Sequence, residues 1–345
     1  MLLTLDAVRR ETWRVVVRTR AGRAAARDPD LRLAALGAGH LAVAFTLAAL
    51  VPHWLLLVGP LILGIPHVLA DFRLLLARGP DLARWRLGAV LVPAAAMLVL
   101  RSLQVHGLPI PHWTDVACGM VALTLALTTI PRRPAVRAAA FLAGAALTTL
   151  ALNSWHTVAL GFAHAHNLVA LGVFAGFAYH RGLKSAPSVV LALALAGGLA
   201  LWLGAAEWTH GVERSVAAAE STGLTLAGLA AGLAPWLEPA AAVRLVTVYA
   251  FLQAVHYTAW LRLNPAVWPG LRAAPTSFAR DAAEWRAALG DGPAAAALLL
   301  CIAVPLVALL DAPSTRSAYL SVASFHGWME LAVLLHWAAL RRSNP

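Results

Sequence analysis

Five histidines and two acidic residues lie in the apolar middles of four hydrophobic segments of this chain. They are His67 with Asp71, His164 and His166, His256, and His326 with Glu330. An ionisable side chain in hydrocarbon costs at least about 2.5 kcal/mol, so it is usually retained only where a partner compensates it. Neutral imidazole is the commonest protein ligand for transition metals. These residues therefore indicate a metal centre inside a membrane protein.

Two of the segments carry a histidine that is followed four residues later by an acid. The pairs are His67 with Asp71 and His326 with Glu330, and residues four apart share one face of a helix. Each acid can bind the same metal as its histidine, or it can accept the imidazole N–H and fix the tautomer. Helices of this kind enclose one or two irons in carboxylate-rich bundles.

The segment with two histidines offers alternatives. His164 and His166 are about 200° apart on a helix of 3.6 residues per turn, so one of them is expected to be a ligand and the other to pack or hydrogen-bond elsewhere. His164 is favoured as the ligand, because His156 lies two turns earlier near its face.

The amino-acid composition indicates which structural elements position these residues. The 345 residues are 60% hydrophobic and 12% charged, whereas soluble domains are about 25% charged. The chain is therefore expected to be an all-α, polytopic transmembrane bundle, with residues 33–345 as a single domain. About ten apolar segments approach the roughly 20 residues that a span needs. They lie near 33–57, 59–77, 87–105, 115–130, 136–153, 156–179, 187–206, 243–262, 292–311 and 317–340.

The basic residues predict an orientation. Residues 1–32 carry eight arginines among apolar residues, which predicts a basic amphipathic helix on the membrane surface in contact with anionic lipids. The arginines do not form one basic face, so no nucleic-acid partner is expected. Placing both termini in the cytoplasm puts most loop arginines inside. Residues 221–237 are then expected to be re-entrant or interfacial, because a further span there would put the Arg262 to Arg286 loop outside.

In this topology the five histidines share a depth. Counting residues from the segment ends at 1.5 Å each places them within a slab of about 8 Å near the middle of the membrane. Unrelated structural histidines have no reason to agree in depth. We therefore expect His67, His256, His326 and one of the pair at 164 and 166 to bind one metal centre.

Four stretches around these histidines resemble the Brp/Blh family of bacterial membrane beta-carotene dioxygenases. Residues 64–71 read Gly-Ile-Pro-His-Val-Leu-Ala-Asp, close to the family's first motif, Gly-Leu-Pro-His-x-x-x-Asp. Residues 162–167, 251–260 and 325–330 are similar to its three later histidine helices. The chain departs from the pattern where Trp260 replaces a second histidine, where the second helix lacks its acid, and where the fourth lacks its proline.

The resemblance spans about residues 59–340, and only its first motif is specific. It implies a bundle of apolar helices in a bacterial inner membrane, a non-haem iron bound by histidines, and cleavage of a carotenoid by dioxygen. Since Trp260 cannot be a ligand, His166 or His326 would supply the missing one.

The first functional hypothesis is a membrane-embedded non-haem iron oxygenase or oxidase acting on a lipid-soluble substrate, with carotenoid cleavage as its narrowest form. Asp71 and Glu330 would orient ligands or occupy a carboxylate position. Arg73 is the one cationic residue near the depth of the histidines, so an uncharged isoprenoid or acyl chain is expected. The side chains expected to align it are Phe162, Trp260, Phe325 and Trp328.

Two other hypotheses remain open. A haem b or quinone-linked electron carrier needs only two facing histidines, which leaves the acids unexplained. A proton-coupled transporter could use His67 with Asp71 and His326 with Glu330 as a relay. Transporters often contain inverted repeats, but both of these helices are expected to run from outside to inside.

Overall fold

The computed structural model describes residues 2–77, 84–128, 134–222, 224–268 and 278–341. Every regular element within these ranges is a helix, and none of the residues there forms a strand. The predicted all-α class is confirmed. A helix satisfies its own backbone N–H and C=O groups, which a segment surrounded by hydrocarbon requires.

Eight apolar helical stretches are long enough to cross a membrane, which indicates a multi-pass membrane protein. They are Pro29–Leu50, Pro52–Leu75, Pro134–Asn153, Trp155–His180, Ser185–Trp202, Pro239–Val267, Asp291–Ala308 and Ala312–Leu335. The remaining two predicted segments are also helical, but their apolar parts, Leu91–Gln104 and Trp113–Thr128, are shorter. The number of ten spans therefore stays a prediction.

The chain forms two compact units. The first comprises Met1–Arg73 and Asn167–Pro313, and the second comprises Leu74–His166 and Ser314–Pro345. Helix α8 (Trp155–His180) contributes its first half to the second unit and its second half to the first.

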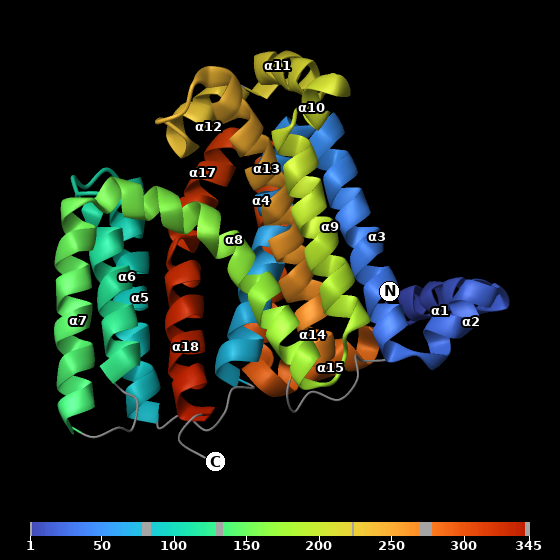
Figure 1. The fold of residues 1–345 in the computed structure, drawn as a ribbon, viewed down its shortest axis with the longest axis horizontal. Helices are drawn as coiled ribbons and strands as arrows, with labels where there is room; N and C mark the ends of the chain where they lie inside the picture. The colour runs from blue at the N-terminus through green and yellow to red at the C-terminus, as the bar shows by residue number, and fades with distance from the viewer. Residues whose placement is uncertain (1, 78–83, 129–133, 223, 269–277, 342–345) are drawn as a thin grey trace. The chain divides into compact units, whose positions relative to one another are not determined.

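The first unit is built around four long helices that run side by side in Figure 1, α3, α4, α9 and α13. Shorter helices lie at its two ends. Its elements are α1 (Leu2–Arg18), α2 (Arg20–Arg27), α3 (Pro29–Leu50), α4 (Pro52–Asp71), α9 (Ser185–Trp202), α10 (Ala205–Trp208), α11 (Gly211–Thr222), α12 (Leu226–Leu233), α13 (Pro239–Thr258), η2 (Ala259–Leu263), α14 (Asn264–Val267), α15 (Phe278–Leu289) and α16 (Asp291–Ala308).

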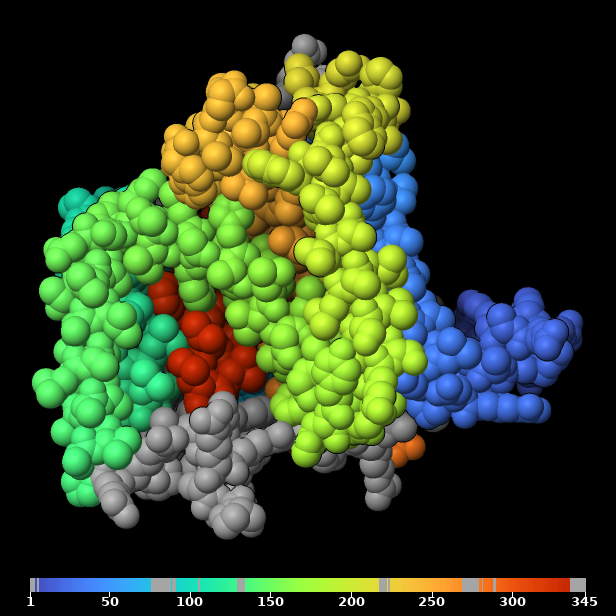
Figure 2. Space-filling view, in the orientation of Figure 1, coloured from blue at the N-terminus to red at the C-terminus, as the bar shows by residue number. Residues whose placement is uncertain are grey.

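Helix α13 is the core of the first unit. It packs against α3, α4 and α9, and in Figure 2 α9 lies on the viewer's side of this unit with only part of α13 visible beside it. A Cβ at Gly197 of α9 would lie 2.8 Å from the ring of Phe251, so glycine allows the two helices to approach closely. Phe251 is fully buried, and its ring meets that of Phe45 on α3 edge to face at 6.3 Å.

In the second unit, α6 packs against α5, α7 and α18. The elements of this unit, besides the first half of α8, are α5 (Arg84–Val105), α6 (Trp113–Thr128), α7 (Pro134–Asn153), α17 (Ala312–Ala323) and α18 (Phe325–Arg341). The π-helical turn η1 (Phe72–Ala77) starts in the first unit and ends in the second. Arg101 on α5 and Asp115 on α6 form a largely buried ion pair, so two charges in an apolar bundle neutralise each other.

Helix breaks fall inside some of the predicted segments, among them at residues 51 and 324. The segment expected at 33–57 ends at Leu50, because Pro52 starts α4, and proline is favoured at the first helical position. The segment expected at 317–340 is interrupted at Ser324, and α18 begins at Phe325. His326 therefore lies in the first turn of a helix and not in the middle of one.

The predicted surface helix at 1–32 is two helices, α1 and α2, which are separated at Thr19. Both extend away from the lower end of α3 in Figure 1. Residues 221–237 contain the short α12 and are not among the candidate spans, in keeping with the re-entrant or interfacial expectation. Some of the loop arginines on which the orientation rests lie outside the described residues, so the orientation stays a prediction; they are Arg78, Arg132, Arg133, Arg272 and Arg342.

Asp30, near the start of α3, joins α3 to α9. Its carboxylate accepts hydrogen bonds from the backbone N–H groups of Lys184, Ser185 and Ala186, at 3.0, 2.8 and 2.7 Å. These groups belong to the first turn of α9, where the helix offers no partner of its own. The Asp30 side chain, at the start of α3, therefore caps the N-terminus of α9.

We expect Asp30→Ala to lower the free energy of unfolding by about 1–2 kcal/mol, because the first turn of α9 loses its acceptor. Thermal unfolding in detergent, followed by circular dichroism, measures the effect. Glu213→Ala is the control, since Glu213 is exposed and bonds only locally to His210. Equal melting temperatures for the two variants would contradict the capping role.

Candidate metal centre

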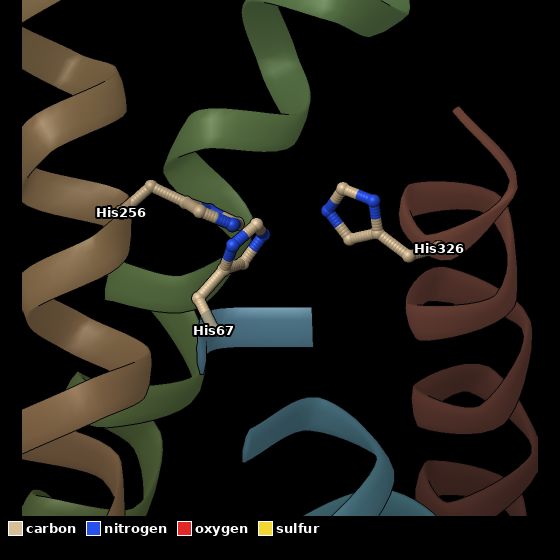
Figure 3. Close-up of side chains that lie close together, drawn as sticks. All are labelled: His67, His256 and His326. Atoms are coloured by element: carbon tan, nitrogen blue, oxygen red, sulfur yellow. The ribbon is translucent and has the colours of Figure 1, made fainter. Parts of the chain in front are cut away.

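The first unit brings two of the predicted histidines together. His67 on α4 and His256 on α13 are 2% and 1% exposed, and their ring centroids are 5.3 Å apart. One nitrogen of each ring lies within 4.8 Å of the other. Figure 3 shows these two rings turned toward each other from separate helices. The ring of Tyr257 lies 4.6 Å from that of His67, a neighbour that the sequence did not identify although it adjoins His256.

The tautomer of His67 follows from its environment. Its Nδ1 lies 3.3 Å from the carbonyl oxygen of Leu63, one turn earlier in α4. A carbonyl can only accept, so Nδ1 carries the proton and Nε2 carries the lone pair. This is the arrangement of a metal-binding imidazole whose other nitrogen is held by the protein. Pro66 precedes His67 and removes one backbone hydrogen bond of α4 beside it.

Both histidine helices of the first unit change to π-helix directly after the site. Asp71, which is fully buried, is the last residue of α4 before η1, and His256 is followed three residues later by η2. Such turns are rare and are frequent at functional sites. Arg73 in η1 is held by α15: its Nη2 is 3.1 Å from Glu284 Oε2, and its guanidinium lies 4.9 Å from the ring centroid of Trp285.

The second unit brings His166 and His326 together. Their Nε2 atoms are 3.2 Å apart, and the rings are nearly perpendicular, at 77°. His166 comes from α8 and His326 from the first turn of α18. Between the two histidines of α8, the structure thus brings His166, and not the favoured His164, to His326. The reason is the 200° separation, which turns His164 to another face of α8.

The outer nitrogens of this pair face acceptors. Nδ1 of His326 bonds to the carbonyl oxygen of Ala323, and Nδ1 of His166 lies 3.7 Å from Oε2 of the fully buried Glu330. A proton on Nδ1 of both rings would leave two Nε2 lone pairs facing each other, and these repel unless a proton or a metal cation lies between them. Glu330 thus approaches the histidine of α8, and not only His326 on its own helix.

The spacing of the pair fits a metal ion. Metal–imidazole bonds are about 2.1 Å long, so nitrogens 3.2 Å apart subtend about 100° at a shared ion. That angle belongs to neighbouring positions in tetrahedral or octahedral coordination. The two imidazoles could therefore serve as neighbouring ligands of one metal ion.

Two of the predicted substrate-binding aromatic residues form a stack of rings beside His166. The rings of Phe162 and Trp328 stack at 3.9 Å and 5°, and Phe162 also stacks on His166 at 5.8 Å. Gly119 on α6 lies directly against the Trp328 indole, and Gly327 lies against both His166 and Phe162. The two glycines, which the sequence analysis did not single out, leave the room that this stack needs.

The other two predicted aromatics are placed differently. Trp260 is fully buried in η2 of the first unit, with its ring centroid 6.1 Å from that of Trp268. Phe325 is half-buried at the first position of α18. His164 is half-buried in α8. The histidine pairs at 67 and 256 and at 166 and 326 belong to different units, so the prediction of one shared centre stays a prediction.

No family model, no curated protein and no solved structure matches this chain. The resemblance to the Brp/Blh family therefore rests on the quoted motifs alone.

We expect Gly327→Ala to weaken metal binding about 10-fold, as the loss of support for a ligand does. The added Cβ would lie 3.0 Å from Nδ1 of His166 and 3.1 Å from a ring carbon of Phe162, so the imidazole must move. Titration of metal-free protein with Co²⁺, followed by its visible absorption, measures the affinity. Gly161→Ala on α8 is the matched control, because its Cβ would meet nothing within 4 Å. Equal affinities in both variants would show that His166 is not a ligand.

Proposed function

We propose that this protein is a membrane-embedded non-haem iron oxygenase or oxidase that acts on an uncharged, lipid-soluble substrate. The observation that carries the proposal is the pair His166 and His326, whose Nε2 atoms face each other at 3.2 Å while both Nδ1 atoms face acceptors. The second pair, His67 and His256, adds two more buried imidazoles. Imidazole with carboxylate and open positions is the donor set of non-haem iron oxygenases.

The chain's own residues would divide the work. Glu330 and the Ala323 carbonyl hold protons on the outer nitrogens of the imidazole pair and keep their lone pairs directed at the metal. In the first unit, the buried Asp71 would orient a ligand or fill a carboxylate position. Phe162 and Trp328 present flat apolar faces to a long hydrocarbon and exclude water. When bound, iron would supply the activation of dioxygen.

The same contacts support a second candidate function. Without a metal, His326, His166 and Glu330 form a short chain in which a proton shared between the two Nε2 atoms could move toward the carboxylate. A proton-coupled transporter would use such a chain. The two functions differ in whether the purified protein holds stoichiometric metal.

The substrate would enter from the lipid of a bacterial inner membrane. Anionic lipids would surround the basic helices α1 and α2, and both chain termini would lie in the cytoplasm. The carotenoid hypothesis is the narrowest form of the proposal, because a polyene is long, flat and uncharged. The Brp/Blh-like motifs around His67, His166, His256 and His326 support it.

We expect detergent-purified protein to contain iron, measured by elemental analysis, and to lack the strong Soret absorption of haem. Glu330→Gln and Asp71→Ala should each lower metal affinity by about 10- to 100-fold, because outer-shell carboxylates have effects of this size. His40→Ala is the control, since the ring of His40 bonds within α3 to Leu36. The stoichiometry also tells whether the two histidine pairs hold one ion or one each. Metal-free protein with intact fold would reject the oxidase and favour transport.

We expect expression in a carotenoid-producing bacterial host to bleach the pigment and release retinal, and we expect His326→Ala to abolish the bleaching. Pigment extraction and chromatography of the products measure both. If the pigment stays unchanged in cells whose protein is loaded with iron, carotenoid cleavage is excluded and another apolar substrate must be sought. His40→Ala again serves as the variant that should keep the activity.

A further inference from the structure

Three buried polar atoms of the first unit have no hydrogen-bond partner. They are Nδ2 of Asn167, Nε1 of Trp260 and Oδ1 of Asn264, and their residues are 3%, 0% and 0% exposed. Folded proteins leave few such atoms unsatisfied, and each one calls for a water, an ion or a ligand. None of them belongs to the histidine pairs described above.

The three residues lie on two segments that pack against each other. The second half of α8 runs alongside η2 and α14: Asn264 Nδ2 lies 3.4 Å from the Ala170 carbonyl oxygen, and the ring centroids of Phe177 and Trp268 are 4.9 Å apart. Residue numbers rise together along the two contacting segments, so they run in the same direction, as α8 and α13 do in Figure 1. Asn167 is one turn before Ala170, and Trp260 is one turn before Asn264. Counting by turns therefore places Asn167 and Trp260 at a similar level on the two segments.

This position adjoins the proposed chemistry. Trp260 follows His256 by four residues, which is about one turn along α13 and η2. Buried apolar residues flank these positions along the two segments, among them Leu171, Phe174 and Leu263. A ligand that reaches these atoms is thus surrounded by hydrocarbon and lies next to a candidate metal-binding imidazole.

The donors and the acceptor define the ligand. Asn167 and Trp260 each offer an unused N–H, and Asn264 offers an unused carbonyl oxygen. All three groups are uncharged, so a charged ligand would be buried without compensation. A hydroxyl group accepts two hydrogen bonds and donates one, which matches this set.

Resting on the function proposed above, we infer that Asn167, Trp260 and Asn264 form a binding site for an alcohol group of the substrate. The hydroxyl oxygen accepts hydrogen bonds from Asn167 Nδ2 and Trp260 Nε1, and the hydroxyl group donates a hydrogen bond to Asn264 Oδ1. The substrate class is accordingly a hydroxylated isoprenoid or polyene and not a pure hydrocarbon. An ordered water offers the same bonds, but it gives the protein no preference between the two.

Binding of two probes to the full-length protein in detergent tests the site. The probes are geranylgeraniol, a C20 isoprenoid alcohol, and the hydrocarbon of the same skeleton. We expect the alcohol to bind at least about 10-fold more tightly, since each hydrogen bond to an uncharged group contributes about a 5-fold change. Asn167→Leu and Trp260→Phe remove one donor each at similar volume. Each should weaken alcohol binding about 5-fold and leave hydrocarbon binding unchanged.

The controls separate this site from packing and from the metal centre. Trp208→Phe changes an exposed tryptophan, which is 72% accessible, and should alter neither affinity. Equal binding of the two probes to the unmodified protein, as a bound water would give, overturns the inference. So does a loss in the variants that is the same for alcohol and hydrocarbon. Metal content is measured on the same samples: an alcohol preference in metal-free protein would keep this site while rejecting the oxidase.

Discussion

An imidazole in hydrocarbon has no water to bond, so each ring nitrogen must find its partner in the protein. This constraint organises the candidate site. The Nδ1–H of His67 donates a hydrogen bond to a carbonyl oxygen of its own helix, and the Nδ1–H of His326 donates one to the carbonyl oxygen of Ala323. Ala323 ends α17, and the last carbonyls of a helix have no partner within the helix. The break at Ser324 thus creates the acceptor that fixes the tautomer of the next histidine.

Fixing one nitrogen defines the role of the other. Once Nδ1 donates, the Nε2 of a neutral imidazole can only accept, and a buried pair of such acceptors needs a proton or a metal cation between them. The second unit meets this condition with one histidine from the interior of α8 and one from the start of α18. The first unit uses two helix interiors, with Pro66 and two π-turns nearby. The two units therefore hold similar imidazole pairs by different local means.

Much of the fold could be predicted from hydropathy, because apolar runs near 20 residues have few alternatives in a bilayer. The sequence also indicated His67, Asp71, His256, His326 and Glu330 as candidate site residues, since polar residues in apolar helices are rare. The pairing of histidines from different helices could not be predicted. Helical periodicity relates residues on one helix, so it linked Glu330 to His326, whereas the carboxylate also approaches His166 across the bundle. Proline marked the start of α4, but no residue type marked the break at Ser324. Gly327 matters because its missing side chain leaves room for His166 and Phe162. A sequence pattern does not show which glycine has this role.

The π-turns η1 and η2 have a consequence for comparing chains of this kind. Each turn takes in one residue more than an α-helical turn, so every side chain beyond it is rotated by about 100° from the position that α-helical counting gives. A related chain that lacks the extra residue would present a different face after Asp71 or after His256 while keeping both residues in place. An alignment of such chains must therefore carry a one-residue gap inside residues 72–77 or 259–263, even where the surrounding helices match without interruption.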